Sequence, residues 1–183
     1  MPPFLQQLAA ALGDYLARHP EEGEGVALFE AFLASHAAVF ERGHAVGHFT
    51  GSAWLVSGDG ERVLLMHHRK LDRWLQPGGH ADGDADLMRV ALREAQEETG
   101  VAGLHAEGGI FDLDRHRIPA RGDEAEHWHY DVRYVVRAGT NERFTINQES
   151  RALTWRSVAE VAKDQSLDIS LRRMARKWLG GTA

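Results

Sequence analysis

The stretch ALREAQEETGV, residues 91–101, decides the fold of this chain, because it places three carboxylates within five positions of one helix. At 3.6 residues per turn, Glu94 and Glu98 fall on the same line as Leu87 and Ala91. An apolar line of this kind normally faces the protein interior. Carboxylates that point toward a core need a cation, because burying them unpaired is very costly.

A plain solvent-exposed acidic face fits this helix poorly. Its polar side lies elsewhere, at Arg89, Arg93 and Gln96. The third carboxylate, Glu97, sits at the edge of the inward line. Lysine or arginine could balance these charges, but three acidic groups in one turn suit a hard divalent ion with oxygen ligands. The sequence therefore predicts a divalent-cation site.

Composition narrows the class of protein. A chain of 183 residues with 43% hydrophobic content predicts one domain with a short extension. The absence of cysteine excludes disulfides and thiolate zinc sites, and suits a reducing compartment. A net charge of −6 argues against an extended nucleic-acid surface. Glu30 and His36 interrupt the most apolar stretch, and the start lacks a basic segment, so neither a membrane span nor a signal peptide is expected. We expect a cytoplasmic protein.

The order of elements indicates an α/β sandwich with a mixed β-sheet. Residues 1–45 are expected to form an N-terminal helical extension, and residues 46–183 the main domain. Hydrophobic periodicity predicts the following elements in chain order: helices over 4–16 and 26–33, strands over 52–57 and 62–68, a long loop over 71–86, a helix over 86–99, strands over 106–118, 127–138 and 152–158, and helices over 158–164 and 166–179.

The segment from Gly79 to Val101 resembles the Nudix box, Gly-x5-Glu-x7-Arg-Glu-U-x-Glu-Glu-x-Gly-U, where U is a bulky aliphatic residue. Two positions depart from the pattern. Ala85 stands where the box has its first glutamate, and Ala95 is smaller than the usual aliphatic residue. The resemblance implies a Nudix-type α/β/α sandwich with a mixed sheet.

The resemblance extends beyond the box, from about Gly51 to Leu179. Many family members carry a glutamate on the loop before a tryptophan-containing strand. Glu149 and Trp155, in NQESRALTW, are similar to that pair. The N-terminal helices lie outside the resemblance.

The resemblance implies a metal-dependent hydrolase that cleaves the diphosphate linkage of a nucleoside diphosphate derivative, with water attacking at phosphorus. The implied cofactor is Mg²⁺ or Mn²⁺, which would lower the pKa of the attacking water. The implied catalytic residues are Glu97, Glu149 and Arg93, with Arg93 expected to orient Glu97 one turn on. The implied metal ligands are the carbonyls of Gly78 or Gly79 and the carboxylates of Glu94, Glu97 and Glu98.

Eleven histidines raise the alternative of a zinc hydrolase, which needs three such ligands and one open position. The spacing supplies candidates but no complete set: His67, His68, His80, His127 and His129.

Three other residues are predicted to bind substrate. His129 and Arg133 share one face of the strand over 127–138, where Arg133 could bind a phosphate. An exposed sheet face is the alternative. Trp74 could stack on a base or pack structurally.

Two functional classes stay open. The intact glutamates favour a hydrolase, whereas Ala85 allows a catalytically weak nucleotide-binding or sensor module. Asp84 or Asp86 could replace the missing carboxylate, or could simply cap the helix. The expected partner is a small nucleotide whose identity cannot be read from the sequence, and a homodimer is left open.

Overall fold

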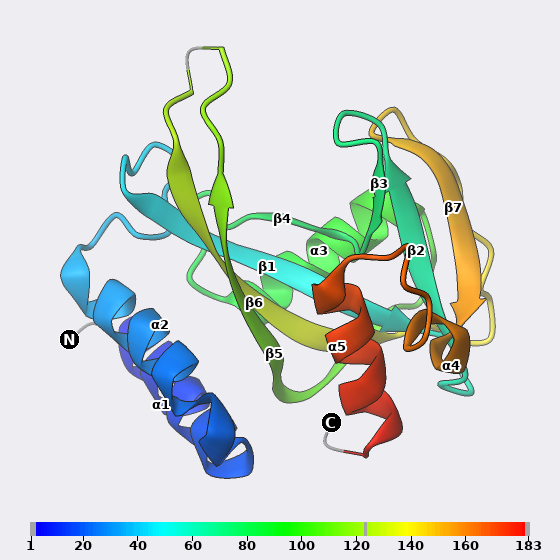
Figure 1. The fold of residues 1–183 in the computed structure, drawn as a ribbon, viewed down its shortest axis with the longest axis horizontal. Helices are drawn as coiled ribbons and strands as arrows, with labels where there is room; N and C mark the ends of the chain where they lie inside the picture. The colour runs from blue at the N-terminus through cyan, green and yellow to red at the C-terminus, as the bar shows by residue number, and fades with distance from the viewer. Residues whose placement is uncertain (1–2, 123, 182–183) are drawn as a thin grey trace.

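A mixed seven-stranded β-sheet forms the middle layer of the structure (Figure 1). The computed structural model describes residues 3–122 and 124–181. The strands are β1 (Gly47–Val56), β2 (Arg62–His68), β3 (Arg73–Leu75), β4 (Gly78–His80), β5 (His105–Ile118), β6 (His127–Arg137) and β7 (Ser150–Ser157). Strands β1 and β6 run parallel in the interior of the order β3-β2-β1-β6-β5, while β4 pairs with β1 and β7 with β2.

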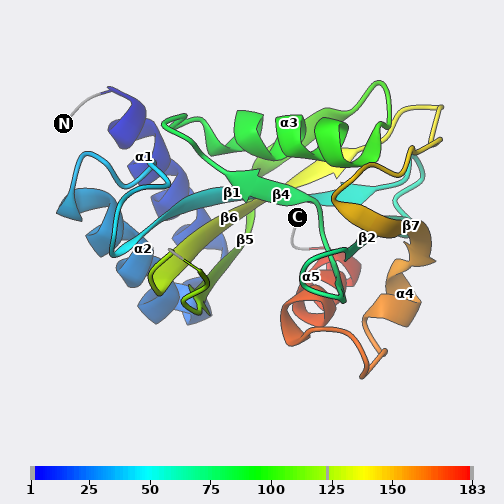
Figure 2. The ribbon, with the colours of Figure 1, turned by 90° about the horizontal axis from the view of Figure 1, so that it is seen from above.

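Helices cover both faces of this sheet (Figure 2). They are α1 (Pro3–Arg18), α2 (Gly23–Ser35), α3 (Leu87–Thr99), α4 (Val158–Val161) and α5 (Ile169–Leu179). Helix α3 lies on one face, and α4 and α5 lie on the other. Leu87, Val90 and Ala91 of α3 are buried in one core cluster with Val132 and Tyr134 of β6, as the helical periodicity predicts. The predicted α/β/α sandwich is confirmed.

The N-terminal helices α1 and α2 lie side by side beyond the β5 edge (Figures 1 and 2). Phe32 stacks on Tyr130 of β6 with ring centroids 3.8 Å apart, and Phe29 meets the same ring edge-on at 5.4 Å. Aromatic pairs at these separations contribute about 0.5–1.5 kcal/mol beyond the area they bury. The extension therefore shares the core of the main domain, and a boundary at residue 45 stays a prediction.

The structure corrects two predicted boundaries. The predicted loop over 71–86 contains the short strands β3 and β4, because their backbones pair with β2 and β1. Strand β1 begins at Gly47 rather than at residue 52, and its first residues pair with β6. Asp123, between β5 and β6, lies outside the described residues, as do residues 1–2 and 182–183 at the ends.

Candidate active site

Local signals fix both ends of helix α3. The Asp86 side chain accepts a hydrogen bond from the backbone N–H of Arg89 at 3.0 Å, which satisfies one of the free donors at the helix start. At the other end, Gly100 adopts the left-handed conformation with φ 67° and donates its N–H to the Gln96 carbonyl. The helix thus begins and ends where the sequence predicts.

Glu98 is the most deeply buried carboxylate of this helix, with 5% of its surface exposed. Its Oε2 accepts a hydrogen bond from the backbone N–H of Gly78 at 2.8 Å, so the carboxylate faces the Gly78–Gly79 loop. Burial, with smaller contributions from the nearby carboxylates of Glu94 and Glu149, raises the pKa of Glu98 to about 8 against the opposing effect of the Gly78 N–H. A carboxylate in these surroundings favours binding of a proton or a cation.

Glu94 lies against the same loop. A Cβ at position 79 would come within 2.5 Å of the Glu94 Oε2, so only glycine allows this approach. Burial raises the pKa of Glu94, and the Arg93 guanidinium opposes that rise. The guanidinium donates to Glu94 Oε1 at 2.8 Å and to the His80 carbonyl at 3.1 Å. The expectation that Arg93 orients Glu97 is wrong, because Arg93 holds Glu94 instead.

Glu149 reaches the site from the segment just before β7. Its backbone is anchored by two hydrogen bonds, from the N–H of Arg69 to the Glu149 carbonyl at 2.8 Å and from the Glu149 N–H to Asn147 Oδ1 at 2.9 Å. Asn147 also donates to the backbone carbonyl of Glu97 at 3.2 Å, which ties this segment to α3. The Glu149 side chain is exposed but close enough to raise the pKa of Glu98. The Glu97 side chain is also exposed.

The donor set of this site fits a hard divalent cation. Glu94, Glu98 and Glu149 supply carboxylate oxygens, which Mg²⁺ and Mn²⁺ prefer. Their mutual repulsion raises the pKa of Glu98, and a bound cation would relieve that repulsion. Among the described residues, however, no three of these carboxylates lie within 4.8 Å of one another.

The residues around Ala85 act at the helix start. Asp84 accepts two hydrogen bonds from the Arg89 guanidinium, at 2.6 and 2.8 Å, and accepts a third from the Asp86 backbone N–H at 2.9 Å. Asp86 caps the helix. Both carboxylates are therefore occupied in local contacts, which favours the capping interpretation over replacement of the missing box glutamate.

A cavity of about 360 Å³ opens beside Trp74, on the side of the sheet that α5 covers. His67, Arg73 and Asp168 are among the other residues that line it. Trp74 is half-buried and packs partly against the core, with its ring 5.0 Å from that of His67. Both predicted roles of Trp74, stacking and packing, are therefore compatible with its position.

Arg133 is not available to a phosphate, contrary to expectation. Its side chain is 2% exposed, and it donates to Asp131 at 2.8 Å and to Asp112 at 3.2 Å. A third carboxylate, that of Asp114, lies 3.3 Å away. The face of β6 that carries these residues is buried, so the alternative of an exposed sheet face is wrong as well. Arg133 stabilises the buried face of β6, because the three carboxylates around it could not be buried without a cation.

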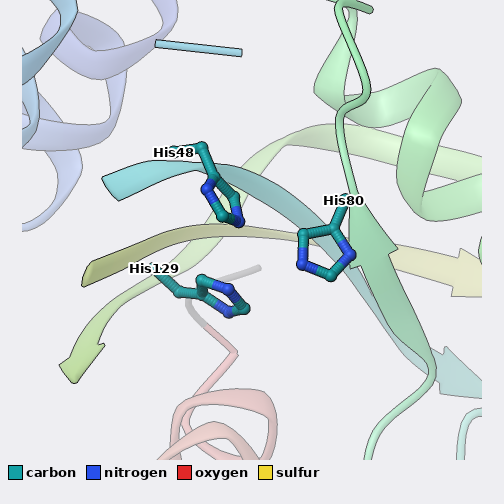
Figure 3. Close-up of side chains that lie close together, drawn as sticks. All are labelled: His48, His80 and His129. Atoms are coloured by element: carbon teal, nitrogen blue, oxygen red, sulfur yellow. The ribbon is translucent and has the colours of Figure 1, made fainter. Parts of the chain in front are cut away.

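His129 lies near two other histidines, His48 of β1 and His80 of β4 (Figure 3). The candidate histidines named from the sequence included His80 and His129 but omitted His48. A signal for it exists, because His48, Thr50 and Ser52 alternate with the apolar face of β1 and so predict an earlier strand start.

Comparison with known proteins identifies the family. Residues 48–178 match the family model described as NUDIX domain. The chain belongs to the Nudix family. Over 107 residues it is 32% identical to the Xenopus laevis protein named m7GpppN-mRNA hydrolase NUDT17, which is 54% of this chain and 35% of that protein. The chain thus spans about a third of the length of this curated relative.

Solved structures share the Nudix fold with this chain. A C. elegans Ap4A hydrolase in a binary complex matches with a TM-score of 0.57 at 16% identity, covering 73% of this chain and 96% of that one. A UDP-X diphosphatase matches with a TM-score of 0.54 at 18% identity, covering 98% of this chain and 94% of that one. The second match therefore includes most of the N-terminal helices. The prediction of a Nudix hydrolase is confirmed at the level of the family, and the roles of individual site residues stay predictions.

Proposed function

We propose that this chain is a metal-dependent hydrolase that cleaves the diphosphate linkage of a nucleoside diphosphate derivative. The observation that carries the proposal is the buried Glu98 carboxylate, whose pKa is raised to about 8 beside Glu94 and Glu149 at the Gly78–Gly79 loop. Membership of the Nudix family, and matched relatives that are named as hydrolases, support it.

Glu94 and Glu98 are the proposed metal ligands, together with a carbonyl of Gly78 or Gly79. Mg²⁺ or Mn²⁺, when bound, neutralises the diphosphate and lowers the pKa of the attacking water. Glu98 is held in place by the Gly78 N–H, and Glu94 by Arg93, so both carboxylates are oriented before any ligand arrives. Glu97 is exposed at the edge of this site and contributes negative charge beside Glu94.

Glu149 is the proposed general base, or a ligand of a second ion. It belongs to a different element from the helix glutamates, and it is exposed enough to accept a proton from a water molecule. The cavity beside Trp74 is the proposed site for the base or the second moiety of the substrate, because an aromatic face can stack on a base. His129 belongs to a separate cluster of histidines, which makes it a weaker candidate for contact with substrate.

The test is turnover of a substrate panel by the metal-stripped protein with Mg²⁺ or Mn²⁺ added back. The names of the matched relatives suggest three members of the panel, a uridine diphosphate derivative, a dinucleoside tetraphosphate and a methylated cap dinucleotide, and a nucleoside triphosphate is added as a fourth. We expect a nucleoside monophosphate and a second phosphorylated fragment, with ¹⁸O from labelled water in one of them. Carbon–oxygen cleavage, or activity that survives chelation, would contradict the proposal.

A binding-only role is the second candidate, and Ala85 favours it. The box lacks its first glutamate, and the two neighbouring aspartates are engaged in capping and with Arg89. Tight nucleotide binding with no product from any panel member would support this role.

The cellular location and the oligomeric state of the protein are also proposals. Within the described part of the chain, no helix combines the length and the apolar character needed to cross a bilayer. A cytoplasmic location rests on the absence of cysteine. A small nucleotide is the proposed partner, without an extended nucleic-acid surface, and a homodimer is tested by the mass of the protein in solution.

A further inference from the structure

Three histidines from three different strands converge on one point (Figure 3). In the parallel pair β1–β6, His48 lies directly beside His129, so both side chains project from the same face. His80 pairs with Thr50 in the antiparallel pair β1–β4, two residues along from His48 on that face. One ring nitrogen from each of the three lies within 4.8 Å of the others. The sheet register therefore creates this cluster, which sequence spacing alone could not reveal.

His48 has no hydrogen-bond partner at either ring nitrogen, although its side chain is 1% exposed. A neutral imidazole carries one donor and one acceptor, and leaving such a group buried and unsatisfied is unfavourable. Apolar packing does not explain this position, because the ring is surrounded by other imidazoles with centroids 4.7–5.0 Å away. An unsatisfied polar group of this kind points to a ligand.

We propose that His48, His80 and His129 bind a divalent transition-metal ion, Zn²⁺ by preference, separate from the glutamates of helix α3. Neutral imidazole is the ligand type that Zn²⁺ accepts readily, whereas Mg²⁺ and Mn²⁺ prefer carboxylates. Three protein ligands leave one of four tetrahedral positions open for water or for a donor atom of another molecule.

Zinc binding would require only a small adjustment of the observed positions of the three rings. Zinc–nitrogen bonds of about 2.0–2.1 Å in a tetrahedron hold nitrogens roughly 3.4 Å apart. The nitrogens, now within 4.8 Å, would close by at most about 1.4 Å, which small side-chain rotations can supply. Both ring nitrogens of His48 lack a hydrogen-bond partner, so a nitrogen lone pair is available at this position.

Neighbouring groups surround the site without blocking it. His127 lies with its Nε2 3.3 Å from the His129 Nε2, and its Nδ1 contacts the Ala125 carbonyl at 2.8 Å. Arg42 contacts the His80 Nδ1, and its side chain is 57% exposed with Asp82 3.7 Å away. Because Arg42 is an exposed side chain with a second partner, it can leave His80 when a metal binds.

Zinc titration of the metal-stripped full-length protein tests the proposal. Excess Mg²⁺ is kept present to occupy the glutamates, and binding is followed by calorimetry and by competition with a chromogenic chelator. We expect one zinc ion per chain. His80→Ala and His129→Asn should each weaken binding by more than the roughly 10–100-fold that loss of an outer hydrogen-bonding partner of a metal ligand costs. Substitution with Co²⁺ should give the visible absorption of a four-coordinate site.

Two control variants make the result specific. His105→Ala removes an exposed histidine at the far end of the β5–β6 pair and should leave the zinc affinity unchanged. Glu98→Gln should also leave it unchanged, because the proposed site contains no glutamate. Unfolding temperatures without zinc show whether each variant is folded, and His80 and His129 are both only partly buried, so their replacement should be tolerated. Equal affinity in His80→Ala and His105→Ala, loss of zinc binding in Glu98→Gln, or no zinc binding by the unmodified chain would each overturn the proposal.

Discussion

Replacing Glu98 by glutamine should make the metal-free protein more stable at pH 8 while removing its response to metal. The pKa of Glu98 is about 8 in the folded protein against an ordinary value of 4.5, so between these two pH values the folded state holds a proton that the unfolded state has released. The free energy of unfolding therefore falls as the pH rises between these two values. At about 1.4 kcal/mol per pH unit, this effect amounts to about 5 kcal/mol over the whole interval. Glutamine keeps an acceptor for the Gly78 N–H and carries no ionisable group.

Urea unfolding of the chelated proteins from about pH 5 to about pH 8 measures this effect. The stability of Glu98→Gln relative to the unmodified chain should rise by about 1.4 kcal/mol per pH unit across this range. Glu30→Gln, which removes an exposed carboxylate on α2, is the matched control. Added Mg²⁺ at about 100 times its dissociation constant should stabilise the unmodified chain by about 2.7 kcal/mol and should stabilise Glu98→Gln far less. Parallel profiles of the two proteins across the pH range would refute the inference that Glu98 holds its proton.

Four further outcomes are expected. Glu149→Gln should lower kcat with little change in KM, because a base acts mainly in the transition state, and steady-state kinetics would show a raised KM instead if the residue only bound substrate. Arg93→Gln should raise the Mg²⁺ concentration needed for half-maximal activity, because Glu94 loses the guanidinium that holds it; an unchanged metal titration would exclude that role. Asp86→Ala should lower stability by about 1 kcal/mol in thermal unfolding and leave metal dependence alone, as expected of a helix cap. Lys177→Met should cost about 3 kcal/mol in urea unfolding, because it leaves buried carboxylates short of a cation, and a cost near zero would contradict this reasoning.

Local signals made the box helix predictable from sequence. Its cap at Asp86, its stop at Gly100 and its inward stripe through Leu87 depend on residues within a few positions of one another. The same holds for the apolar alternation along β6, which places Tyr130 and Val132 in the core. These features follow from the period of 3.6 residues in a helix and of two residues in a strand, and both periods can be read directly from the sequence.

Contacts between distant segments were not predictable in the same way. Helical spacing suggested Glu97 as the partner of Arg93, but the His80 carbonyl on β4 draws the guanidinium toward Glu94 instead. Arg133 appeared free because Asp112 lies on another strand, in a register that β-bulges in β5 determine. Tertiary pairing decided both cases, and a single sequence does not display it.

The buried ammonium of Lys177 joins the two ends of the chain. It donates to Tyr15 at 2.6 Å and to Glu22 at 2.8 Å in the N-terminal segment, and to Asp112 of β5 at 2.8 Å. A truncated protein that starts near residue 46 would lose two of these partners. It would also expose the ring of Phe49, which packs in one core cluster with residues of the N-terminal helices, to water. We therefore expect such a fragment to aggregate or to require a solubilising partner. Transfer of this domain into another protein would therefore have to include the first two helices.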